Sequence, residues 1–402
     1  MTTTTPNGPL TGLRVLDLTR VLAGPTCTQM LGDLGAEVIK IERPEAGDDT
    51  RAFAPPYVPN TRESSYFVGV NRNKKSVTVD IASAAGQEII LKLLENCDIL
   101  VENFKVGALA KYGLGFEQLS QKFPGLIYCS ITGFGQTGPY APRPGYDALI
   151  QAMGGVMSLT GEIEGEPQKV GVPVADVFAG LYGCIGILAA LRHKQATGQG
   201  QQVDIGMLDT SVAWLANQAS NFLATGENPP RLSNQHPNIV PYQVFPTADG
   251  YMVLSIGNDP TFERFCKNFG LEHLLTDERY ATNAARVQNR ALVTETMTAL
   301  TKTMATKDWI SKLEALKIGC GPINTLKDVF SDPHVVARNM TVQMQHASGK
   351  EVTVIANPVK LSATPPTYRS AAPILGQHND EVLGGLGYDA PAIEAMRKAG
   401  TI

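Results

Sequence analysis

Residues 13–42, which read LRVLDLTRVLAGPTCTQMLGDLGAEVIKIE, decide the fold. The apolar alternation over residues 13–18 predicts a β-strand. Residues 25–34 predict a helix, because Pro is favoured in a first helical turn and Gly35 is a common stop signal. The Val- and Ile-rich segment 36–42 predicts a second strand. A strand, a helix and a strand in close succession indicate a β-α-β unit.

The same rhythm continues through the first half of the chain. We expect further strands at 76–80, 98–101, 126–132 and 202–205, with helices at 85–95 and 208–223. This order predicts an α/β fold with a Rossmann-like, mostly parallel sheet covered by helices. The turn after the first strand, RVLAGP over residues 20–25, lacks the G-x-G-x-x-G pattern of dinucleotide-binding proteins.

The composition of the sequence changes after the long helix expected at 208–223. Residues 226–238 are polar and contain three prolines, which is typical of a linker. We therefore expect a large Rossmann-like domain over 1–225 and a smaller α+β domain over 226–330. The C-terminal segment 331–402 is expected to return to the large domain.

The composition is that of a soluble globular chain, with 402 residues, 43% hydrophobic, 18% charged and a net charge of -4. The charge and the lack of a basic tract exclude a nucleic-acid binder held by phosphate contacts. Six scattered cysteines without a C-x-x-C pair, and six dispersed histidines, predict no metal site. The N-terminus lacks a targeting pattern, so we expect a cytoplasmic protein.

Asp176 stands at the head of a stretch, 177–191, that carries no charged residue. We expect an apolar helix from Asp176 to about residue 194, with a small-residue face for packing on another helix. The uncharged run itself is too short to span a membrane. A carboxylate at the edge of an apolar helix costs free energy unless something compensates for it. Asp176 either caps the helix, as Asp often does, or it has a chemical task.

Basic residues gather at 71–75, which read NRNKK, just before an expected strand. One interpretation is a solvated turn. The other is a phosphate clamp to which Arg43, after the second strand, contributes. Adjacent strands of a parallel sheet end on the same side, and ligands bind at that edge.

Several segments together resemble the class III CoA-transferases of the CaiB/BaiF type, which include formyl-CoA:oxalate and carnitine CoA-transferases. They are LDLTRVLAGP at 16–25, GDLGAEVIKIERP at 32–44, NRNKK at 71–75, VENF at 101–104, SITGFG at 130–135, GYD at 145–147 and PILGQH at 373–378. The chain is most similar to the succinyl-CoA:dicarboxylate (glutarate-like) branch. The shared segments are GDDTR at 47–51, GQTGP at 135–139 and IVPYQ at 239–243.

The resemblance implies an enzyme with Asp176 as its nucleophile. It implies an interlocked homodimer and no tightly bound cofactor, since the coenzyme A thioester is the substrate. The coenzyme A contacts that it implies are Val21, Leu22, Arg43, Asn71, Arg72, Lys74, Lys75, Val79, Asn103, Lys111, Arg143 and Tyr146. Lys111 stands where relatives often have Arg.

The reaction expected from the resemblance moves CoA from an acyl-CoA such as succinyl-CoA to a dicarboxylic acid. A carboxylate attacks the thioester to give a mixed anhydride, and the released thiolate then gives an aspartyl-CoA thioester. We expect Asp176 to be kept ionised by the helix N-terminus. Arg51, Arg72, Arg143 and His236 are candidates to bind the far carboxylate of the acid, unless they are surface ion pairs or, for His236, a solvated loop residue.

The sequence departs from two relatives of this group. Residues 233–238 read SNQHPN, without the glycine-rich loop of the formyl-CoA transferase, so oxalate and formate are not expected substrates. The acyl-CoA racemases carry a histidine within Gly-His-Asp where this chain has GYD at 145–147, so the second proton-transfer group is missing. A racemase or epimerase is the alternative enzyme, and a silent CoA-thioester binding protein is the alternative without catalysis.

Overall fold

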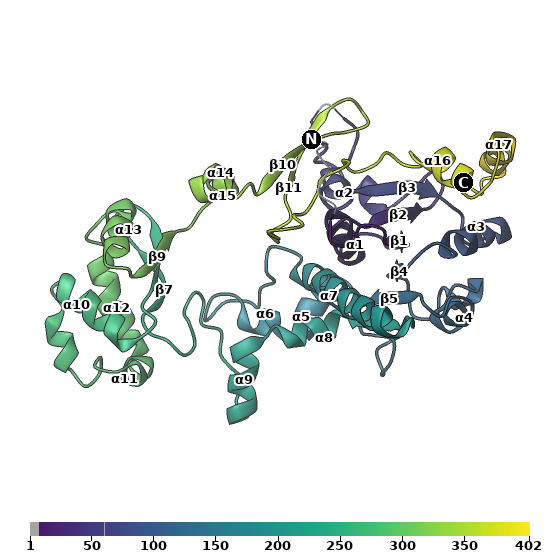
Figure 1. Ribbon diagram of the computed structural model, residues 1–402. Helices are drawn as coiled ribbons and strands as arrows, with labels where there is room; N and C mark the ends of the chain where they lie inside the picture. Colours follow the sequence, from purple (N-terminus) through teal and green to yellow (C-terminus); the bar gives the residue numbers. More distant parts are fainter. Residues whose placement is uncertain (1–7, 60) are drawn as a thin grey trace. The chain divides into compact units, whose positions relative to one another are not determined.

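The computed structural model describes residues 8–59 and 61–402, and the chain divides into two compact units (Figure 1). Residues 157–168 and 216–333 form unit 2, and the rest of the chain forms unit 1. Residues 216–225 therefore belong to unit 2 instead of the large domain expected over 1–225. The N-terminal segment that bears on targeting lies, as residues 1–7, outside the described part.

Unit 1 is built on a six-stranded sheet with the order β3-β2-β1-β4-β5-β6. The strands are β1 (Arg14–Asp17), β2 (Glu37–Glu42), β3 (Lys74–Thr78), β4 (Ile99–Glu102), β5 (Ile127–Thr132) and β6 (Gln202–Gly206). Neighbouring strands are parallel, as the sequence predicted. The chain leaves β1 toward β3 and returns to β4 on the other side, which opens a crevice at the carboxyl ends of β1 and β4.

Helices cover both faces of this sheet (Figure 1). Side chains of a strand alternate between faces, so Val15 and Val101 lie in the core under one helix layer, and Leu16 and Leu100 lie under the other. The first layer holds α1 (Ala23–Asp33), α5 (Asp147–Met153), α7 (Val174–Thr197) and α8 (Met207–Ala213). The second holds α3 (Ala84–Leu94), α4 (Phe116–Lys122), α16 (Asn379–Gly385) and α17 (Ala390–Lys398).

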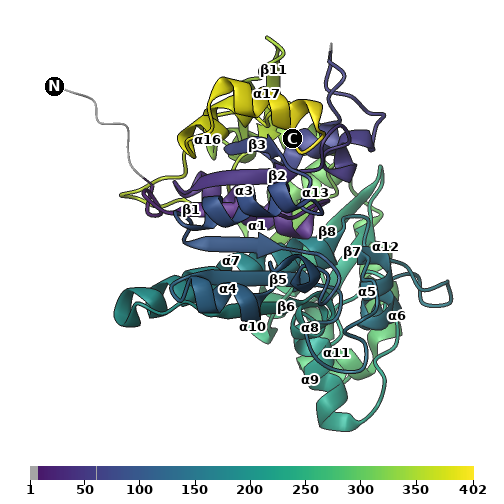
Figure 2. The ribbon, with the colours of Figure 1, turned by 90° about the vertical axis from the view of Figure 1, so that its right-hand side faces the viewer.

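Short helical segments complete unit 1 between these elements. They are η1 (Asp49–Ala52), α2 (Ser65–Val70), η2 (Ala110–Tyr112) and α6 (Val156–Leu159), which ends in unit 2. The β10 (Thr341–Gln345) and β11 (Glu351–Ile355) hairpin packs with α2 in a small apolar cluster. Asn379 fixes the C-terminal segment to β3, because its side chain accepts the Thr78 N–H and donates to the Thr78 hydroxyl. Figure 2 shows α16 and α17 beside β3.

The helix that carries Asp176, α7, is longer than the uncharged run suggested. It has 24 residues and ends three residues beyond the expected end at about residue 194. It is long and apolar enough to cross a membrane by length and composition alone, which the length of the uncharged run did not indicate. Its Ala175, Ala179 and Gly183 are buried against the core that α1 shares. A Cβ at Gly180 would lie 2.6 Å from the carbonyl oxygen of Ala23, so the absence of a side chain lets α7 approach the start of α1.

The helix expected over 208–223 is two helices. α8 ends at Ala213, and α9 (Ala216–Thr225) begins at Ala216, whose φ is +49°. An alanine in this left-handed conformation cannot continue a right-handed helix, and the amphipathic pattern gave no sign of the break.

Unit 2 combines a three-stranded antiparallel sheet with several helices around a core that includes Trp309 and Phe262. Its strands are β7 (Tyr242–Pro246), β8 (Tyr251–Ser255) and β9 (Gly319–Pro322). Its helical segments, besides α9, are α10 (Asp259–Asn268), η3 (Glu272–Thr276), α11 (Asn283–Gln288), α12 (Arg290–Thr301), α13 (Thr306–Ala315) and α14 (Leu326–Ser331), after which α15 (Pro333–Ala337) leads into unit 1. The sequence missed β9 because Gly and Pro are poor strand formers.

Candidate active site

Two cavities open at the crevice between β1 and β4, and they share Arg20 and Phe104 as lining residues. Both residues lie in the loops that directly follow those strands. The cavities are called here the β2–β3 pocket and the Asp176 pocket. A ligand that runs past Arg20 and Phe104 reaches both.

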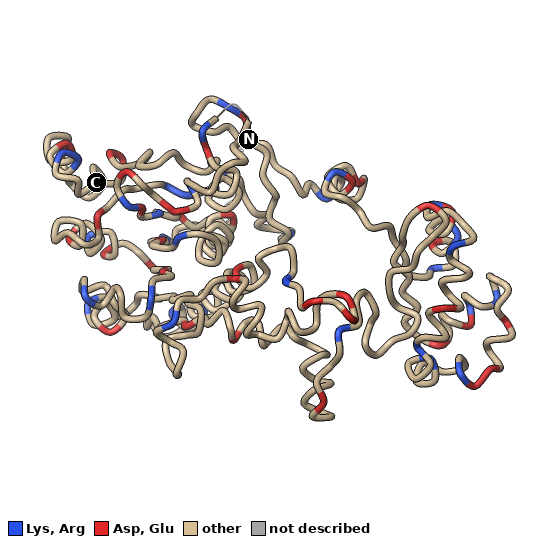
Figure 3. The backbone as a smooth tube through the Cα atoms, turned by 180° about the vertical axis from the view of Figure 1, so that it is seen from behind, with Lys and Arg blue, Asp and Glu red and all other residues tan. Residues whose placement is uncertain are grey.

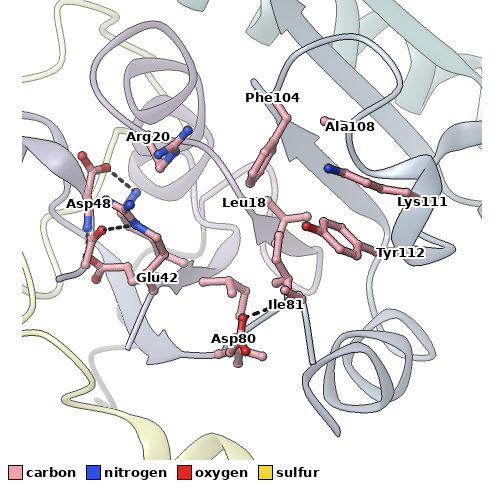
Figure 4. A pocket seen from close by; sticks show the side chains of 16 residues that line it. Leu18, Arg20, Glu42, Asp48, Asp80, Ile81, Phe104, Ala108, Lys111 and Tyr112 are labelled. Carbon is pink, nitrogen blue, oxygen red and sulfur yellow. Dashed lines mark hydrogen bonds and ion pairs between the residues drawn. The ribbon is translucent and has the colours of Figure 1, made fainter. Parts of the chain in front are cut away.

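The β2–β3 pocket, of about 290 Å³, has apolar walls and a basic rim. Leu18, Phe104 and Tyr112 supply apolar surface. Figure 4 shows Phe104, Tyr112 and Lys111 on one side of the cavity and Glu42 and Asp48 on the other. At the rim, Asp49 accepts from both Arg20 (3.0 Å) and Arg43 (2.6 Å), which holds two guanidinium groups at one edge of the pocket. This composition suits a ligand with a flat apolar group and negative charge. The remaining lining residues are Lys40, Ile41, Gly47, Val79, Asp80, Ile81 and Ala82, with Ala108 beyond them.

The Asp176 pocket, of about 340 Å³, contains one partly buried carboxylate among several cations. Arg20, Lys105 and Arg143 line it, and Lys105 and Arg143 are exposed to solvent. Arg143 packs over the rings of Phe134 and Tyr140. An anionic ligand that enters this pocket meets fixed positive charge on its way to Asp176. On a larger scale, basic and acidic residues interleave along the chain (Figure 3).

Asp176 lies in the first turn of α7 but does not cap that helix. The N-cap residue is Pro173, whose side chain makes no capping bond. The α7 backbone N–H of Ala175 instead donates to Oδ1 of Asp147, at 2.9 Å, and the other oxygen of Asp147 accepts from Gln151. The capping interpretation of Asp176 was therefore wrong, and its carboxylate is left available for chemistry.

The surroundings of Asp176 raise its pKa from 3.8 to about 7. Burial is the main cause, the nearby Asp147 carboxylate adds to it, and a hydrogen bond from the backbone N–H of Ala23 opposes both. The expectation that a helix N-terminus holds Asp176 fully ionised is thus not met. The N–H group that stabilises the charged form belongs to the start of α1, which Gly180 allows α7 to approach.

The turn between β1 and α1 is held from two sides. Asn103 accepts the Arg20 N–H (2.9 Å) and donates to the Arg20 carbonyl oxygen (2.8 Å), and Asp48 accepts the Val21 N–H (3.2 Å). Val21 has a φ of +70°, a conformation that is strained for a β-branched residue. This turn leads directly into Ala23, the partner of Asp176.

The structure brings eight of the predicted coenzyme A contacts to the two pockets together with the predicted nucleophile. Val21, Leu22, Asn103, Arg143 and Tyr146 line the Asp176 pocket, and Arg43, Val79 and Lys111 line the β2–β3 pocket, so that the crevice gathers residues from six separate stretches of the chain. Tyr146 is 71% exposed. Long-range parallel pairing is what brings these stretches to one edge of the sheet.

The loop 71–75 does not reach either pocket. Lys74 is buried, and its ammonium donates to Asp17, Asn71 and the carbonyl oxygen of Pro25. Arg72 is buried and forms a two-bond pair with Asp33. Lys75 pairs with Glu37 and Glu381. Residues 71–73 precede β3 and residues 74 and 75 begin it, so the stretch lies at the amino edge of the sheet. The expected phosphate clamp is a structural ion-pair cluster instead.

Two of the four candidates for the far carboxylate of the acid, Arg51 and His236, also have other partners. Arg51 forms a two-bond pair with Glu42 and its guanidinium lies 3.6 Å over the ring of Phe67, so it is committed to the fold. His236 belongs to unit 2, where its ring stacks on Tyr242 and burial lowers its pKa.

Sequence reasoning missed Arg20, Phe104, Lys105 and Asp147 as pocket residues. The first three follow β1 or β4 directly, so the rule that ligands bind at the carboxyl edge was enough to find them. Asp147 acts through a contact 28 residues along the chain, and no local pattern reveals such a contact. Within the described ranges, no group of three or more His, Cys, Asp or Glu side chains is placed to hold a metal ion.

Comparisons with known proteins agree on one group. The family model described as CoA-transferase family III matches residues 10–379. The succinate–glutarate CoA-transferase of Agrobacterium fabrum is 46% identical over 94% of this chain and 96% of its own length. The human succinyl-CoA:glutarate CoA-transferase is 42% identical over 98% of this chain and 90% of its own. The crystal structure of a CAIB/BAIF family protein from Brucella suis superposes with a TM-score of 0.83, at 46% identity over 94% of this chain and all of that one.

Proposed function

This chain belongs to CoA-transferase family III, and from that premise we propose that it transfers CoA from succinyl-CoA to a dicarboxylic acid through Asp176. The observation that carries the proposal is the position of Asp176. Its carboxylate lies at the end of a crevice that continues past Arg20 and Phe104 into a pocket with apolar walls and basic edges. The relatives named for succinate, succinyl-CoA and glutarate support the class of acid.

In this proposal the two pockets hold the two ends of the CoA thioester. The adenine ring occupies the β2–β3 pocket against Phe104 and Tyr112, and the phosphates meet the guanidinium groups of Arg20 and Arg43. Lys111, at the edge of the same pocket, supplies a further positive charge. The pantetheine arm then runs along Phe104 and carries the thioester into the Asp176 pocket.

The chemistry begins when the ionised carboxylate of Asp176 attacks the thioester carbonyl of succinyl-CoA. The C–S bond breaks, CoA leaves as thiolate, and a mixed anhydride of Asp176 and succinate remains. The thiolate attacks the aspartyl carbonyl, which releases succinate and forms an aspartyl-CoA thioester. The acceptor acid then attacks this thioester, and the same steps run in reverse. The Ala23 N–H, which favours the charged form of the Asp176 carboxyl, stabilises the oxyanion at that group.

Arg143 is the candidate that remains for the far carboxylate of the dicarboxylic acid. Arg51, which is partly exposed, and Arg72, which is buried, are held in two-bond pairs with Glu42 and Asp33. Arg143 lines the Asp176 pocket, is exposed, and is held in place by packing over two aromatic rings. A planar guanidinium in this position matches a carboxylate in geometry and charge.

A panel of carboxylic acids tests the function. The protein is incubated with succinyl-CoA and with glutarate, itaconate, malate, citramalate, oxalate or acetate, and the CoA thioesters are identified by mass spectrometry. We expect new thioesters from the dicarboxylic acids of four to five main-chain carbons, with little from oxalate or acetate. Deuterium uptake from heavy water at the acyl α-carbon, without any acid acceptor, would instead indicate a racemase and contradict the proposal.

The pH dependence of transfer is expected to follow the raised pKa of Asp176. Only the ionised form attacks, so kcat/KM with succinyl-CoA should rise about tenfold per pH unit below pH 7 and level off above it. Asp147→Asn removes the like charge and keeps an oxygen for the Ala175 N–H, so it should move the inflection to lower pH. A profile that is unchanged by this substitution would contradict the assignment.

We also propose that the active protein is a homodimer of the interlocked kind. Apolar side chains stand exposed on neighbouring helices of unit 1, with Ile185 on α7 at 59% and Val212 on α8 at 52%. An apolar surface of this kind on one chain is typical of an interface with another. Size-exclusion chromatography with light scattering should give twice the mass of one chain, and a stable monomer at micromolar concentration would rule the dimer out.

A further inference from the structure

We propose that Asp48 is a positioning residue for the reaction: it holds Val21 in a left-handed conformation and thereby sets the start of α1 against the carboxylate of Asp176. This inference rests on the proposed function for its kinetic readout. It assigns a chemical consequence to a side chain that lies at the wall of the β2–β3 pocket but whose carboxylate is fully buried and bonded within the fold.

The Asp48 carboxylate bonds to the turn between β1 and α1, to Thr50, and to Lys40 on strand β2. Oδ1 accepts the Val21 N–H, the Thr50 N–H (2.9 Å) and the Thr50 hydroxyl (2.8 Å). Oδ2 accepts from the buried ammonium of Lys40 at 2.8 Å, and the same ammonium donates to the Thr19 carbonyl oxygen at 2.7 Å. Asp48 and Lys40 thus bind both ends of the short segment between β1 and α1.

These hydrogen bonds stabilise the turn between β1 and α1 in a conformation in which Val21 is strained. Its φ of +70° costs on the order of 1–3 kcal/mol for a non-glycine residue. Without the acceptor at Asp48, Val21 would relax toward a negative φ. That rotation would swing the chain on both sides of it, and Ala23 is only two residues away.

Ala23 connects the conformation of Val21 to the nucleophile Asp176. Ala23 and Asp176 line the same pocket, and the Ala23 backbone N–H acts to lower the pKa of the Asp176 carboxyl. The carbonyl oxygen of Ala23 lies in the space above Gly180, one turn after Asp176 on α7. A shift of Ala23 therefore removes the one backbone donor that favours the charged nucleophile. Loss of a donor of this kind commonly costs 10²–10³-fold in rate when it is complete, so a partial shift should cost about 10- to 100-fold.

The main variant is Asp48→Asn, with Thr50→Val as its matched control. The amide places an N–H₂ group against either Lys40 or the Val21 N–H, whereas Thr50→Val removes a different donor from the same oxygen. We expect Asp48→Asn to lower kcat about 10- to 100-fold, with a KM for succinyl-CoA within about threefold of the parent. Thr50→Val should change kcat less than threefold. Equal losses in the two variants would overturn the proposal.

A second pair of variants separates positioning from general damage. Glycine adopts positive φ without strain, so in a Val21→Gly background Asp48→Asn should cost less than about threefold in kcat. A loss as large as in the Val21 background would overturn the proposal, because this double-mutant cycle isolates the coupling. If Asp48→Asn does not fold, an ester at the Arg20–Val21 linkage removes only the Val21 N–H and carries the same kinetic expectation.

A readout without turnover keeps this inference distinct from the proposed function. Infrared titration of ¹³C-Asp-labelled protein, with the Asp176→Asn spectrum subtracted, reports the ionisation of Asp176 directly. Asp48→Asn, or the ester, should raise the titration midpoint of Asp176 by about one pH unit. An unchanged midpoint would overturn the positioning role even in a protein that transfers CoA. If the titration midpoint rises in a protein that transfers no CoA, the positioning role of Asp48 is supported and the proposed function is contradicted.

Discussion

Replacing Asp176 with Asn is expected to lower kcat for CoA transfer by at least about 10³-fold. The amide has the shape of the carboxylate but cannot form the anhydride, and all later steps depend on that bond. Binding of free CoA should stay within about threefold of the parent, because the β2–β3 pocket does not include residue 176. The variant should unfold at the same temperature as the parent or above it at pH 8, since a carboxylate whose pKa is raised to about 7 is ionised there at a cost.

Trapping identifies the nucleophile independently of the rate. Hydroxylamine added after succinyl-CoA should convert Asp176, and no other acid, to a hydroxamate that peptide mass spectrometry locates. Asp308→Asn is the matched control, because Asp308 occupies the same third position of the first turn in α13 of unit 2. Full exchange activity in Asp176→Asn, or a hydroxamate at a different residue, would remove Asp176 from the mechanism.

Replacing Lys74 with Met is expected to lower the free energy of unfolding by about 3–5 kcal/mol. The substitution leaves Asp17, which is fully buried, without the ammonium 3.1 Å away. Burial alone would raise the pKa of Asp17, but Lys74 and Lys40, with hydrogen bonds from Thr19 and Thr28, lower it to about 2. Without Lys74, the buried Asp17 carboxylate loses a compensating charge, and this lowers the free energy of unfolding.

Lys75→Met is the control for that experiment. Lys75 is the next residue, but its pairs with Glu37 and Glu381 are partly exposed, so the loss should be about 0–1 kcal/mol. Urea denaturation measures both variants, and the KM for succinyl-CoA is measured beside it. A Lys74→Met protein of normal stability with a strongly raised KM would mean that the 71–75 loop binds phosphate after all.

The sequence was sufficient for the fold of unit 1 and for much of the crevice, because the relevant signals there are local. Strand periodicity located the β-α-β units, and residues such as Arg43 follow a strand and so lie at its carboxyl edge. The same rule, applied strictly, excludes residues 71–75, since they precede or begin β3 and so lie at its amino end. The basic residues at 71–75 suggested phosphate binding, although their position at the amino end of the strand argued against it.

Other features depend on contacts between distant residues and leave no local trace. The cap of α7 comes from Asp147, and the pair that holds Arg72 comes from Asp33. The end of α7 at Thr197 lies three residues beyond the end expected from the sequence, at about residue 194. The break between α8 and α9 rests on one residue, Ala216, in a conformation that its side chain does not favour.

The cap on α7 has a consequence for how long the catalyst lasts. In the proposed reaction Asp176 is an anion, an anhydride and a thioester in turn, and only the anion can accept hydrogen bonds as a carboxylate does. Because Asp147 holds the Ala175 N–H throughout, the helix end keeps its anchor in all three states. The stability of the folded protein should therefore not change during turnover. We expect the two covalent intermediates to resist unfolding and proteolysis as well as the resting protein does.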